Sequence, residues 1–440
     1  MAQQTNNFSE WLNQRVDTDS SFVFSEAVRS PSLSKLAGGV FPTRKDEEWR
    51  YTPLGPILNS NPGKDIATAL DIEFVASLKH AVPTAHTIIF LNGEYSDEYS
   101  DDPVDFENAG LSITQLSQLE GPSLKMAEDI ILNSNLTDDN IFQHIALGLS
   151  QAGLFIEVDK SADCKTPIHI IHISTAHSAM TFTNPVNIIR LAINSHLKVI
   201  EQYASPGDAA VITVPANYIK LEDGAGLDYY RIGIENAETQ HVCNTSVKVG
   251  GSGSFRSHQY LLGSHLTRSN LEVSFTGPGA EAVLRGVYLG DDKQHLDVRT
   301  YLDHAHPHCS SDQHFRGILN GHSRGVFNGL VLVRKHAQQT DAQQSNKNLL
   351  LSRDARIDTK PQLEIYADDV KCAHGATVGE LDSDALFYLQ SRGIGKKDAT
   401  LMLTRAFAAE VTQEINIDSL QAYVQGKIAA SLDEMVAPGV

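Results

Sequence analysis

Glycine-rich corners recur along the middle of the chain at a nearly constant interval. Gly226, Gly253 and Gly279 stand 27 and then 26 residues apart, and each opens a strand-like run. A looser fourth copy begins at Gly321. A recurrence of about 20–50 residues is typical of stacked coils, in which each turn buries its inward residues against the next. Because glycine adopts positive φ without strain, it suits the corners of such coils. The interval therefore predicts a parallel β-helix.

From about residue 150, apolar and polar side chains alternate along short runs. Residues two positions apart on a strand point to the same face, so this alternation buries one face of each run. The clearest runs hold three apolar residues each: Ile168, Ile170 and Ile173; Ile189, Leu191 and Ile193; and Leu271, Val273 and Phe275. So long a series of short strands requires a large sandwich, barrel, propeller or solenoid, and the glycine interval favours the solenoid.

The patterns divide the chain into three regions. Residues 1–145 carry helix-like and irregular stretches, and residues 146–381 carry the strand pattern. Helical spacing dominates residues 382–440, where Asp382 or Ser383 can cap the first helix. We therefore expect a mainly β fold, with a β-helix core between an N-terminal and a C-terminal helical region.

The composition excludes several classes of partner. The chain has 35 Lys and Arg against 54 Asp and Glu, and the resulting net charge of −19 repels phosphate backbones and anionic membranes. The four cysteines are scattered, with no CxxC pair, and are too few for a disulfide scaffold. The sequence shows no secretory signal pattern and no run of about 18 apolar residues. We expect a cytoplasmic protein that binds neither nucleic acid nor a membrane.

The stretch DHAHPHCSSDQH, which begins at Asp303, is dense in potential metal donors. Residues two apart on an extended strand share a face, so His304, His306 and His308 can point the same way about 7 Å apart. Neutral imidazoles in that arrangement can hold zinc or iron. Pro307 disturbs the strand, however, and a polar corner of the β-helix explains the same residues. The residues alone leave both interpretations open.

Cys372 and His374 form a second candidate, in the stretch EIYADDVKCAHGATVGELD. Val370, Cys372 and His374 share one parity, opposite to that of the run before them, so a bulge or corner at Asp368–Asp369 must re-aim the chain. Two donors do not complete a tetrahedral metal site, and a second chain is the natural source of the others. The alternative is a buried, inert cysteine beside a hydrogen-bonded histidine.

Three long motifs resemble the SufB/SufD family of iron–sulfur cluster assembly scaffolds. They are FPTRKDEEWRYTPL at 41–54, VFNGLVLVRKHAQQTDAQQSNKNLLLS at 326–352, and TKPQLEIYADDVKCAHGATVGELDSDALFYLQSRGI at 359–394. The CAHGAT form, with glycine after the histidine, is similar to the SufD-like branch of the family. RKDEEWRYT is a family signature without an assigned chemical role, and on physical grounds Trp49 is expected to pin this segment as a surface loop.

The resemblance implies a right-handed parallel β-helix and a non-catalytic scaffold subunit of the SUF system that supports iron acquisition. Its partners in the family are a SufB-like subunit, which packs against the β-helix, and a SufC-like ABC ATPase, which docks on the C-terminal helices. No GxxxxGK[ST] motif occurs in this sequence, which fits a complex in which the partner hydrolyses ATP. In isolation the chain can also form a homodimer.

The resemblance also implies site residues. His374 corresponds to the family histidine at the SufB interface, where the nascent cluster forms, and Cys372 is its neighbour, so both are candidate metal-site residues with His374 favoured. The candidate residues for ATPase docking are Arg392, Lys396, Leu403 and Phe407. No catalytic residue and no tightly bound cofactor are expected in the isolated chain. The complex is expected to hold a transient iron–sulfur cluster, and some family complexes associate with a reduced flavin.

Two other functions suit a β-helix. Enzymes with this fold often act on acidic polysaccharides, but they are usually secreted. A self-sufficient metalloprotein built on His304, His306 and His308 is the second alternative. Metal analysis of the isolated chain separates it from the scaffold, because a scaffold should hold little metal without its partners.

Overall fold

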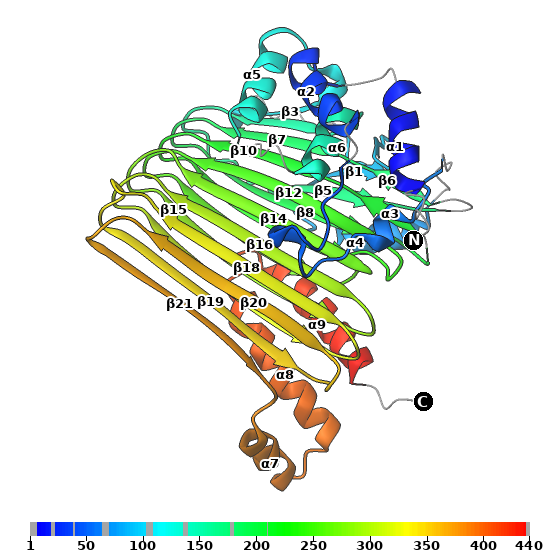
Figure 1. Cartoon of the computed structure of the whole chain (residues 1–440), viewed down its shortest axis with the longest axis vertical. Coiled ribbons are helices and arrows are strands. Elements are labelled where there is room, and N and C mark those ends of the chain that lie inside the picture. Colours follow the sequence, from blue (N-terminus) through cyan, green and yellow to red (C-terminus); the bar gives the residue numbers. More distant parts are fainter. Residues whose placement is uncertain are drawn as a thin grey trace.

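The middle of the chain winds into a parallel β-helix, so the prediction from the glycine interval is confirmed (Figure 1). Each coil adds one strand to each of two facing sheets, which we name sheet A and sheet B. The computed structural model describes residues 7–18, 23–37, 40–63, 70–102, 109–134, 140–176, 180–208 and 210–436. Within this part of the chain, no helix is long and apolar enough to span a lipid bilayer.

Sheet A contains ten strands and sheet B eleven. In order across the sheet, sheet A consists of β2 (Glu94–Tyr95), β1 (His86–Leu91), β5 (Ile168–Ile173), β8 (His196–Ala204), β11 (Gly226–Ile234), β13 (Ser254–Leu261), β15 (Glu281–Gly290), β17 (Ser310–Leu319), β19 (Thr340–Leu350) and β21 (Val370–Gly379). Sheet B consists of β20 (Arg356–Ile365), β18 (Arg324–Val333), β16 (His295–His304), β14 (Leu266–Phe275), β12 (Gln240–Val249), β10 (Ala216–Leu221), β7 (Val186–Leu191), β4 (Leu154–Val158) and β3 (Leu111–Gln115). Off this path, β9 (Val211–Thr213) pairs with β12, and β6 (Thr181–Thr183) pairs with β9.

The register shows what the glycine interval measures. Gly226 lies opposite Ser254, which in turn lies opposite Glu281 in the next strand of sheet A. These steps of 28 and 27 residues are one full coil each. Because every coil repeats the same two strands and two corners, a residue type needed at a corner recurs at the length of a coil.

The corner of the β-helix at which the chain passes from sheet B to sheet A carries a residue with positive φ in every coil but the last. We name this row the corner ladder; it consists of Ser161, Asn194, Gly224, Ser252, Gly279, His308 and Gln339. Each of these backbone N–H groups donates to a carbonyl at the same corner of the following coil, as Gly224 does to Gly251 at 2.8 Å. The expected positive φ is therefore present at Gly279, where φ is +72°.

Two details of the glycine prediction are wrong. Gly226 and Gly253 do not have positive φ; they are needed because their neighbours lie close, since a Cβ at Gly226 would lie 2.6 Å from the His196 ring. Gly321 does have positive φ, but it lies at the opposite corner, between β17 and β18, and so does not continue the same series. The interval nevertheless corresponds to the length of a coil, because both corners of the β-helix recur once in each coil.

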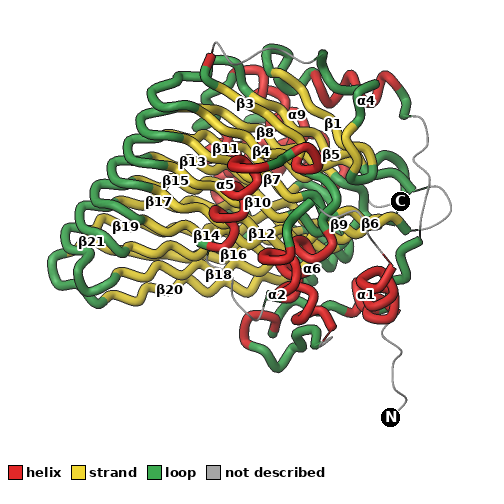
Figure 2. The backbone as a smooth tube through the Cα atoms, turned by 90° about the horizontal axis from the view of Figure 1, so that it is seen from above, coloured by secondary structure: helices red, strands yellow, loops and turns green. Residues whose placement is uncertain are grey.

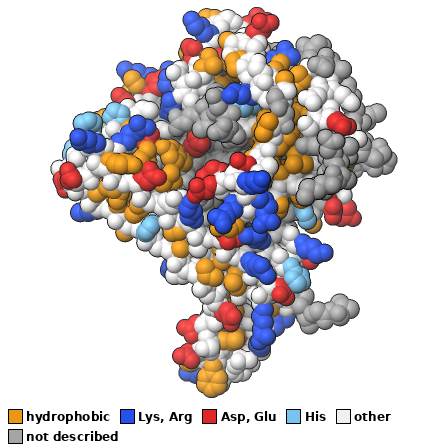
Figure 3. Space-filling model, viewed as in Figure 1, with side chains coloured by type: hydrophobic (Ala, Val, Ile, Leu, Met, Phe, Trp, Pro, Cys, Tyr) orange, Lys and Arg blue, Asp and Glu red, His pale blue; other side chains and the backbone are white. Residues whose placement is uncertain are grey.

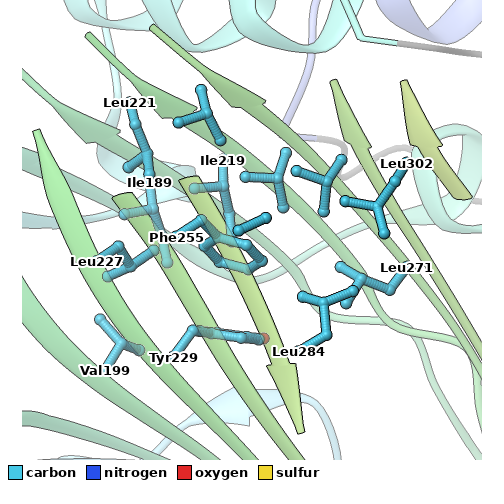
Figure 4. Packing of buried hydrophobic residues seen from close by; sticks show 14 of the residues in the cluster. Ile189, Val199, Ile219, Leu221, Leu227, Tyr229, Phe255, Leu271, Leu284 and Leu302 are labelled. Carbon is cyan, nitrogen blue, oxygen red and sulfur yellow. The ribbon is translucent and has the colours of Figure 1, made fainter. Parts of the chain in front are cut away.

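The core lies between the two sheets. Every second residue of each strand points inward, so aliphatic and aromatic side chains from successive coils stack in columns (Figure 4). Leu227, Phe255 and Leu284 enter from sheet A, and Ile219 and Leu271 meet them from sheet B. The buried alternation read from the sequence thus forms the inner face of the solenoid.

Helices cover the outer faces of both sheets and leave the last coil bare (Figures 1 and 2). The helices of the described residues are α1 (Asn7–Thr18), α2 (Glu26–Ala37), α3 (Gly55–Leu58), α4 (Ile72–Lys79), α5 (Gly121–Leu132), α6 (Ile141–Leu149), α7 (Ser383–Ser391), α8 (Lys396–Thr412) and α9 (Asp418–Met435), with short 3₁₀ helices η1 (Glu47–Trp49) and η3 (Leu116–Gln118). Helices α5 and α6 pack on sheet B, while α8 and α9 pack on sheet A. The N-terminal region also contains strands: β1 and β2 extend sheet A, and β3 extends sheet B.

Candidate functional site

The last coil of the β-helix is open on its outer side. Within the described residues, β21 pairs only with β19 and β20 only with β18, so both strands present an unpaired backbone edge. Figure 1 shows them at the end of the stack that lies away from the N-terminal helices. Apolar side chains are exposed here as well: Tyr366 is 63% exposed and Val378 50%. An unpaired edge beside exposed apolar groups is typical of a surface that another chain covers.

Cys372 and His374 lie on this open coil, in β21. In the β19–β21 register, Cys372 is opposite Ala342 and His374 is opposite Gln344, and both opposing residues are buried. Residues in register on neighbouring strands point to the same face, so both candidates point toward the solenoid axis. The predicted shared parity is therefore confirmed. The chain turns between β20 and β21, where the sequence predicted a corner.

The two candidates differ in accessibility. The His374 side chain is exposed because no further coil covers it, whereas Cys372 is half-buried and packs against the central core. Burial raises the pKa of the Cys372 thiol, and the nearby Asp341 carboxylate raises it further. The thiol is therefore protonated at neutral pH in the isolated chain, and the imidazole is the more accessible donor.

The three histidines at 304–308 do not form a metal site. His304 ends β16 inside the solenoid, where its Nε2 lies 2.9 Å from Ser311 Oγ and burial lowers its pKa to about 4. His306 and His308 lie beyond the strand in the corner, and His308 holds the positive φ of the corner ladder. No three His, Cys, Asp or Glu side chains of the described chain gather in a way that could hold a metal ion. The metal-site interpretation is wrong because the strand ends at His304.

The C-terminal candidates divide into exposed and half-buried residues. Arg392 and Lys396 are exposed beside α7, whose Phe387 is 73% exposed. In Figure 3, hydrophobic side chains stand at the tip of the projection that Figure 1 labels α7. Leu403 and Phe407 are half-buried and line a groove of about 290 Å³ between α8 and the end of β21. As the sequence predicted, the Asp382 carboxylate caps α7, and it accepts hydrogen bonds from two backbone N–H groups.

Residues 41–54 form a strap across the outer face of sheet B, which we name the N-terminal strap. Asp297, which is fully buried in β16, accepts hydrogen bonds from Thr52 at 2.6 Å and from Arg268 at 3.0 Å. The Arg268 guanidinium lies 3.6 Å from the centre of the Trp49 ring, so the expectation that Trp49 pins this segment is confirmed. Two ion pairs add to this attachment: Glu48 pairs with Arg299, also in β16, and Glu47 pairs with Lys360 in β20. The signature holds the N-terminal region on the solenoid.

Loss of one strap hydroxyl is expected to destabilise the fold. Thr52→Val keeps the side-chain shape but removes one donor to the buried Asp297 carboxylate, which then retains only Arg268 and Arg299, so the free energy of unfolding should fall by about 1.5–3 kcal/mol. Urea unfolding followed by tryptophan fluorescence measures the change. Thr43→Val is the matched control: its hydroxyl also bonds a carboxylate, but at an exposed position, so its effect should stay within about 0.5 kcal/mol. Equal effects would contradict the structural role of the strap.

A buried carboxylate cluster lies inside the N-terminal coils. Glu201 is fully buried and accepts four side-chain hydrogen bonds. The donors are Asn187 (2.9 Å), Asn217 (3.1 Å), Tyr203 (2.7 Å) and Tyr229. Burial raises the pKa of Glu201, but the neighbouring His172 and Arg231 outweigh it and lower the pKa to about 2. We name this group the Glu201 cluster.

Arg231 is the buried cation of this cluster. Its guanidinium donates to Ser269 at 2.9 Å and contacts His241, whose other ring nitrogen lies 2.7 Å from Glu235. The cluster was not predicted from the sequence, because its members come from five strands. The signal that reveals it is the inward position of charged residues within otherwise apolar alternating runs, and this signal appears only after the coils are aligned.

Comparison with known proteins gives a consistent result. The family model for the SUF system FeS cluster assembly SufBD core domain matches residues 172–407, more than half of the chain. The iron–sulfur cluster assembly protein SufD of Escherichia coli is 32% identical over 420 residues, which cover 92% of this chain and 93% of that protein. An iron–sulfur cluster assembly SufBD family protein of Synechocystis is 28% identical over 393 residues, covering 86% and 85%. Protein ABCI7, chloroplastic, of Arabidopsis thaliana is 26% identical over 398 residues, covering 88% and 82%.

Fold, open coil and relatives together define the class: this is an assembly protein of the SUF iron–sulfur system, with a parallel β-helix at its centre. The chain belongs to the SufBD family, and its form is SufD-like. The resemblance read from the three motifs is thereby confirmed. Membership of this iron–sulfur assembly family argues against the polysaccharide-active alternative.

Two surface grooves of the described chain do not fit a flavin. The larger, of about 410 Å³, is lined by charged and aliphatic residues such as Lys220, Glu222 and Lys248, with no aromatic ring to stack on an isoalloxazine. The groove beside α8 has one aromatic side chain, Phe407, over which the Arg316 guanidinium already lies at 5.6 Å. A flavin held at either groove would need its stacking surface from another chain.

Proposed function

We propose that this chain is the non-ATPase, SufD-like subunit of a SUF complex. It packs its open last coil against a SufB-like subunit and supplies His374 to the shared site where a nascent iron–sulfur cluster forms, which supports iron acquisition. The observation that carries the proposal is the exposed, inward-pointing position of His374 on the last coil, on which no further coil of the described chain stacks. The cluster is cargo that leaves the site.

The donor chemistry supports this role. An imidazole is a borderline donor that suits ferrous iron and nascent iron–sulfur units. Cys372 packs against the core with a raised pKa, so it contributes mainly to holding β21 in place unless a bound cation lowers the pKa of its thiol. A site completed by two chains can release its cargo when the chains move apart, and a partner ATPase can drive that motion.

The C-terminal helices are the proposed docking site for a SufC-like ABC ATPase in the cytoplasm. α8 and α9 bury their apolar faces on sheet A, whereas α7 leaves Phe387 and Tyr388 exposed. The exposed cations Arg392 and Lys396 border this apolar surface. An aromatic centre with a charged rim is typical of a protein interface.

Co-purification followed by anaerobic reconstitution tests the proposed function. The chain should co-purify with SufB-like and SufC-like chains, and iron and sulfide should assemble into a cluster on the complex but hardly on the isolated chain. Without partners the open coil can pair with a second copy, so a homodimer is expected to disappear when the SufB-like chain is added. Tight iron binding by the isolated chain, or no complex at all, would refute the proposal.

Charge reversal next to α7 is expected to weaken ATPase binding. The double change Arg392→Glu and Lys396→Glu should raise the Kd for a SufC-like chain at least about fivefold, because rim charges steer and orient association. Surface plasmon resonance on the folded variants measures the effect. Lys293→Glu, an exposed lysine at the corner between β15 and β16, is the control and should leave the Kd unchanged. Equal losses from both variants would indicate a net-charge effect and contradict this docking surface.

A further inference from the structure

Gln344 lies directly below His374 in the solenoid interior. The two residues are opposite each other in the β19–β21 register and point to the same side. Gln344 is only 3% exposed, yet neither its amide oxygen nor its amide nitrogen has a hydrogen-bond partner among the described residues. Buried polar groups are rarely left in this state, because each unsatisfied group costs about 1–3 kcal/mol.

The neighbours of Gln344 leave few groups to satisfy its amide. One coil deeper, Gln313 occupies the same column, and its amide oxygen accepts a hydrogen bond from Thr300 across the interior at 2.7 Å. At the level of Gln344, the residue in register with Thr300 is Gly329, which has no side chain. A Cβ at Gly329 would lie 2.2 Å from the Gln344 amide nitrogen, so the glycine makes room for the amide group but offers it no side-chain partner.

The adjacent inward side chain on β19 is already engaged. Asn346 donates to Tyr288 at 3.0 Å, and its amide oxygen accepts from Asn348 at 2.6 Å and from Thr359 at 2.9 Å. Two donors in register with Gln344 are left for its amide oxygen: the imidazole above it, and the amide nitrogen of Gln313 below it, which also lacks a partner among the described residues.

We propose that Gln344 is a positioning residue for His374. Its amide oxygen accepts a hydrogen bond from the imidazole N–H that faces the interior. This bond fixes one tautomer and directs the lone pair of the other ring nitrogen out of the open coil. Metal-binding histidines generally hold their second nitrogen in this way, because the bond orients the ring and raises its basicity. The inference rests on the proposed function for the role of this bond in cluster assembly. The bond itself joins two residues of this chain and needs no partner.

The tautomer of His374 in the isolated full chain tests the inference. Long-range ¹H–¹⁵N spectra of protein labelled with ¹⁵N-histidine, recorded near pH 8 where ordinary imidazoles are neutral, distinguish the two tautomers. His374→Ala identifies the signals by their loss. The wild-type chain should show one tautomer, Gln344→Met a mixture of two, and Gln344→Glu, which retains an acceptor, again one. A mixture in the wild type, or a single unchanged tautomer in Gln344→Met, would overturn the proposal.

Two further measurements exclude a general packing effect. Gln344→Met removes the proposed bond to an exposed imidazole together with a buried amide nitrogen that has no partner, and these effects oppose each other, so its Tm should stay close to that of the wild type. Gln313→Leu, one coil deeper, should lower the Tm yet keep the single tautomer of His374. If Gln313→Leu changed the tautomer as much as Gln344→Met does, positioning by Gln344 would be refuted.

The rate of cluster assembly by the complex is measured separately and tests the role of Gln344 in assembly. In the reconstituted complex, Gln344→Met should lower the rate of cluster assembly by about tenfold, as is usual when a partner of a metal-binding histidine is removed. If the tautomer changed but assembly continued at full rate, Gln344 would still orient the ring, and the proposed function of His374 would be the part that fails. An unchanged tautomer would instead refute positioning while leaving the proposed function intact.

Discussion

Cluster assembly by the reconstituted complex is expected to fall at least about tenfold when His374 is replaced by alanine. The loss should be specific, since the His374 side chain is exposed and contributes little to the core of its own subunit. The Tm of the isolated chain and its co-purification with the SufB-like chain should therefore remain close to wild type. Anaerobic reconstitution and thermal melting on the same preparations measure both quantities.

Two variants serve as controls for His374→Ala. His322→Ala removes another exposed imidazole, at the corner between β17 and β18, and should leave assembly unchanged. Cys372→Ser should have a smaller effect on assembly than His374→Ala, since the half-buried thiol is the less accessible donor. A His374→Ala complex that assembles clusters normally but melts at a lower temperature would show that His374 is a structural histidine.

The Glu201 cluster predicts the largest loss of stability. Glu201→Gln turns an acceptor of four hydrogen bonds into a group with its own donors and leaves the buried Arg231 cation without its nearby carboxylate. Leaving a buried charge uncompensated in this way typically costs about 3–5 kcal/mol. Glu222→Gln is the matched control, because Glu222 pairs with Arg190 at 2.6 Å on a partly exposed surface, and such pairs contribute at most about 1 kcal/mol. Urea unfolding compares the two, and similar losses would contradict the cluster's role.

The contribution of Glu201 should also depend on pH in one direction. Its pKa is lowered from 4.5 in the unfolded chain to about 2 in the fold, so the ionised form is favoured by folding. The resulting stability is fully present above about pH 4.5 and is lost as the pH falls toward 2. The difference in unfolding free energy between wild type and Glu201→Gln should therefore shrink as the pH is lowered from 6 toward 3. A constant difference would show that the ionised carboxylate is not the source of the effect.

The fold was predictable because a solenoid repeats its local rules. The glycine interval marks the coil, and the parity of Cys372 and His374 follows from a period of two. Gln344 and Glu201 were not predicted, because their significance depends on which residues stand one coil away. The register that pairs residues of neighbouring coils cannot be read from a single sequence. The metal-site interpretation of the histidines at 304–308 was wrong because it assumed that the extended strand continues where the chain enters a corner.

The corner ladder has a consequence for how the molecule opens. Each hydrogen bond of the corner ladder joins one coil to the next, so a coil is held mainly by its two immediate neighbours. The stability of the stack is therefore approximately a sum of contributions from neighbouring coils. The coil formed by β20 and β21 has one neighbour only, whereas the opposite end carries the N-terminal helices. Fraying therefore begins at the coil of His374, and its amides should exchange with solvent before those of β13. The part of this chain that loosens most readily is the part that another subunit would hold in place.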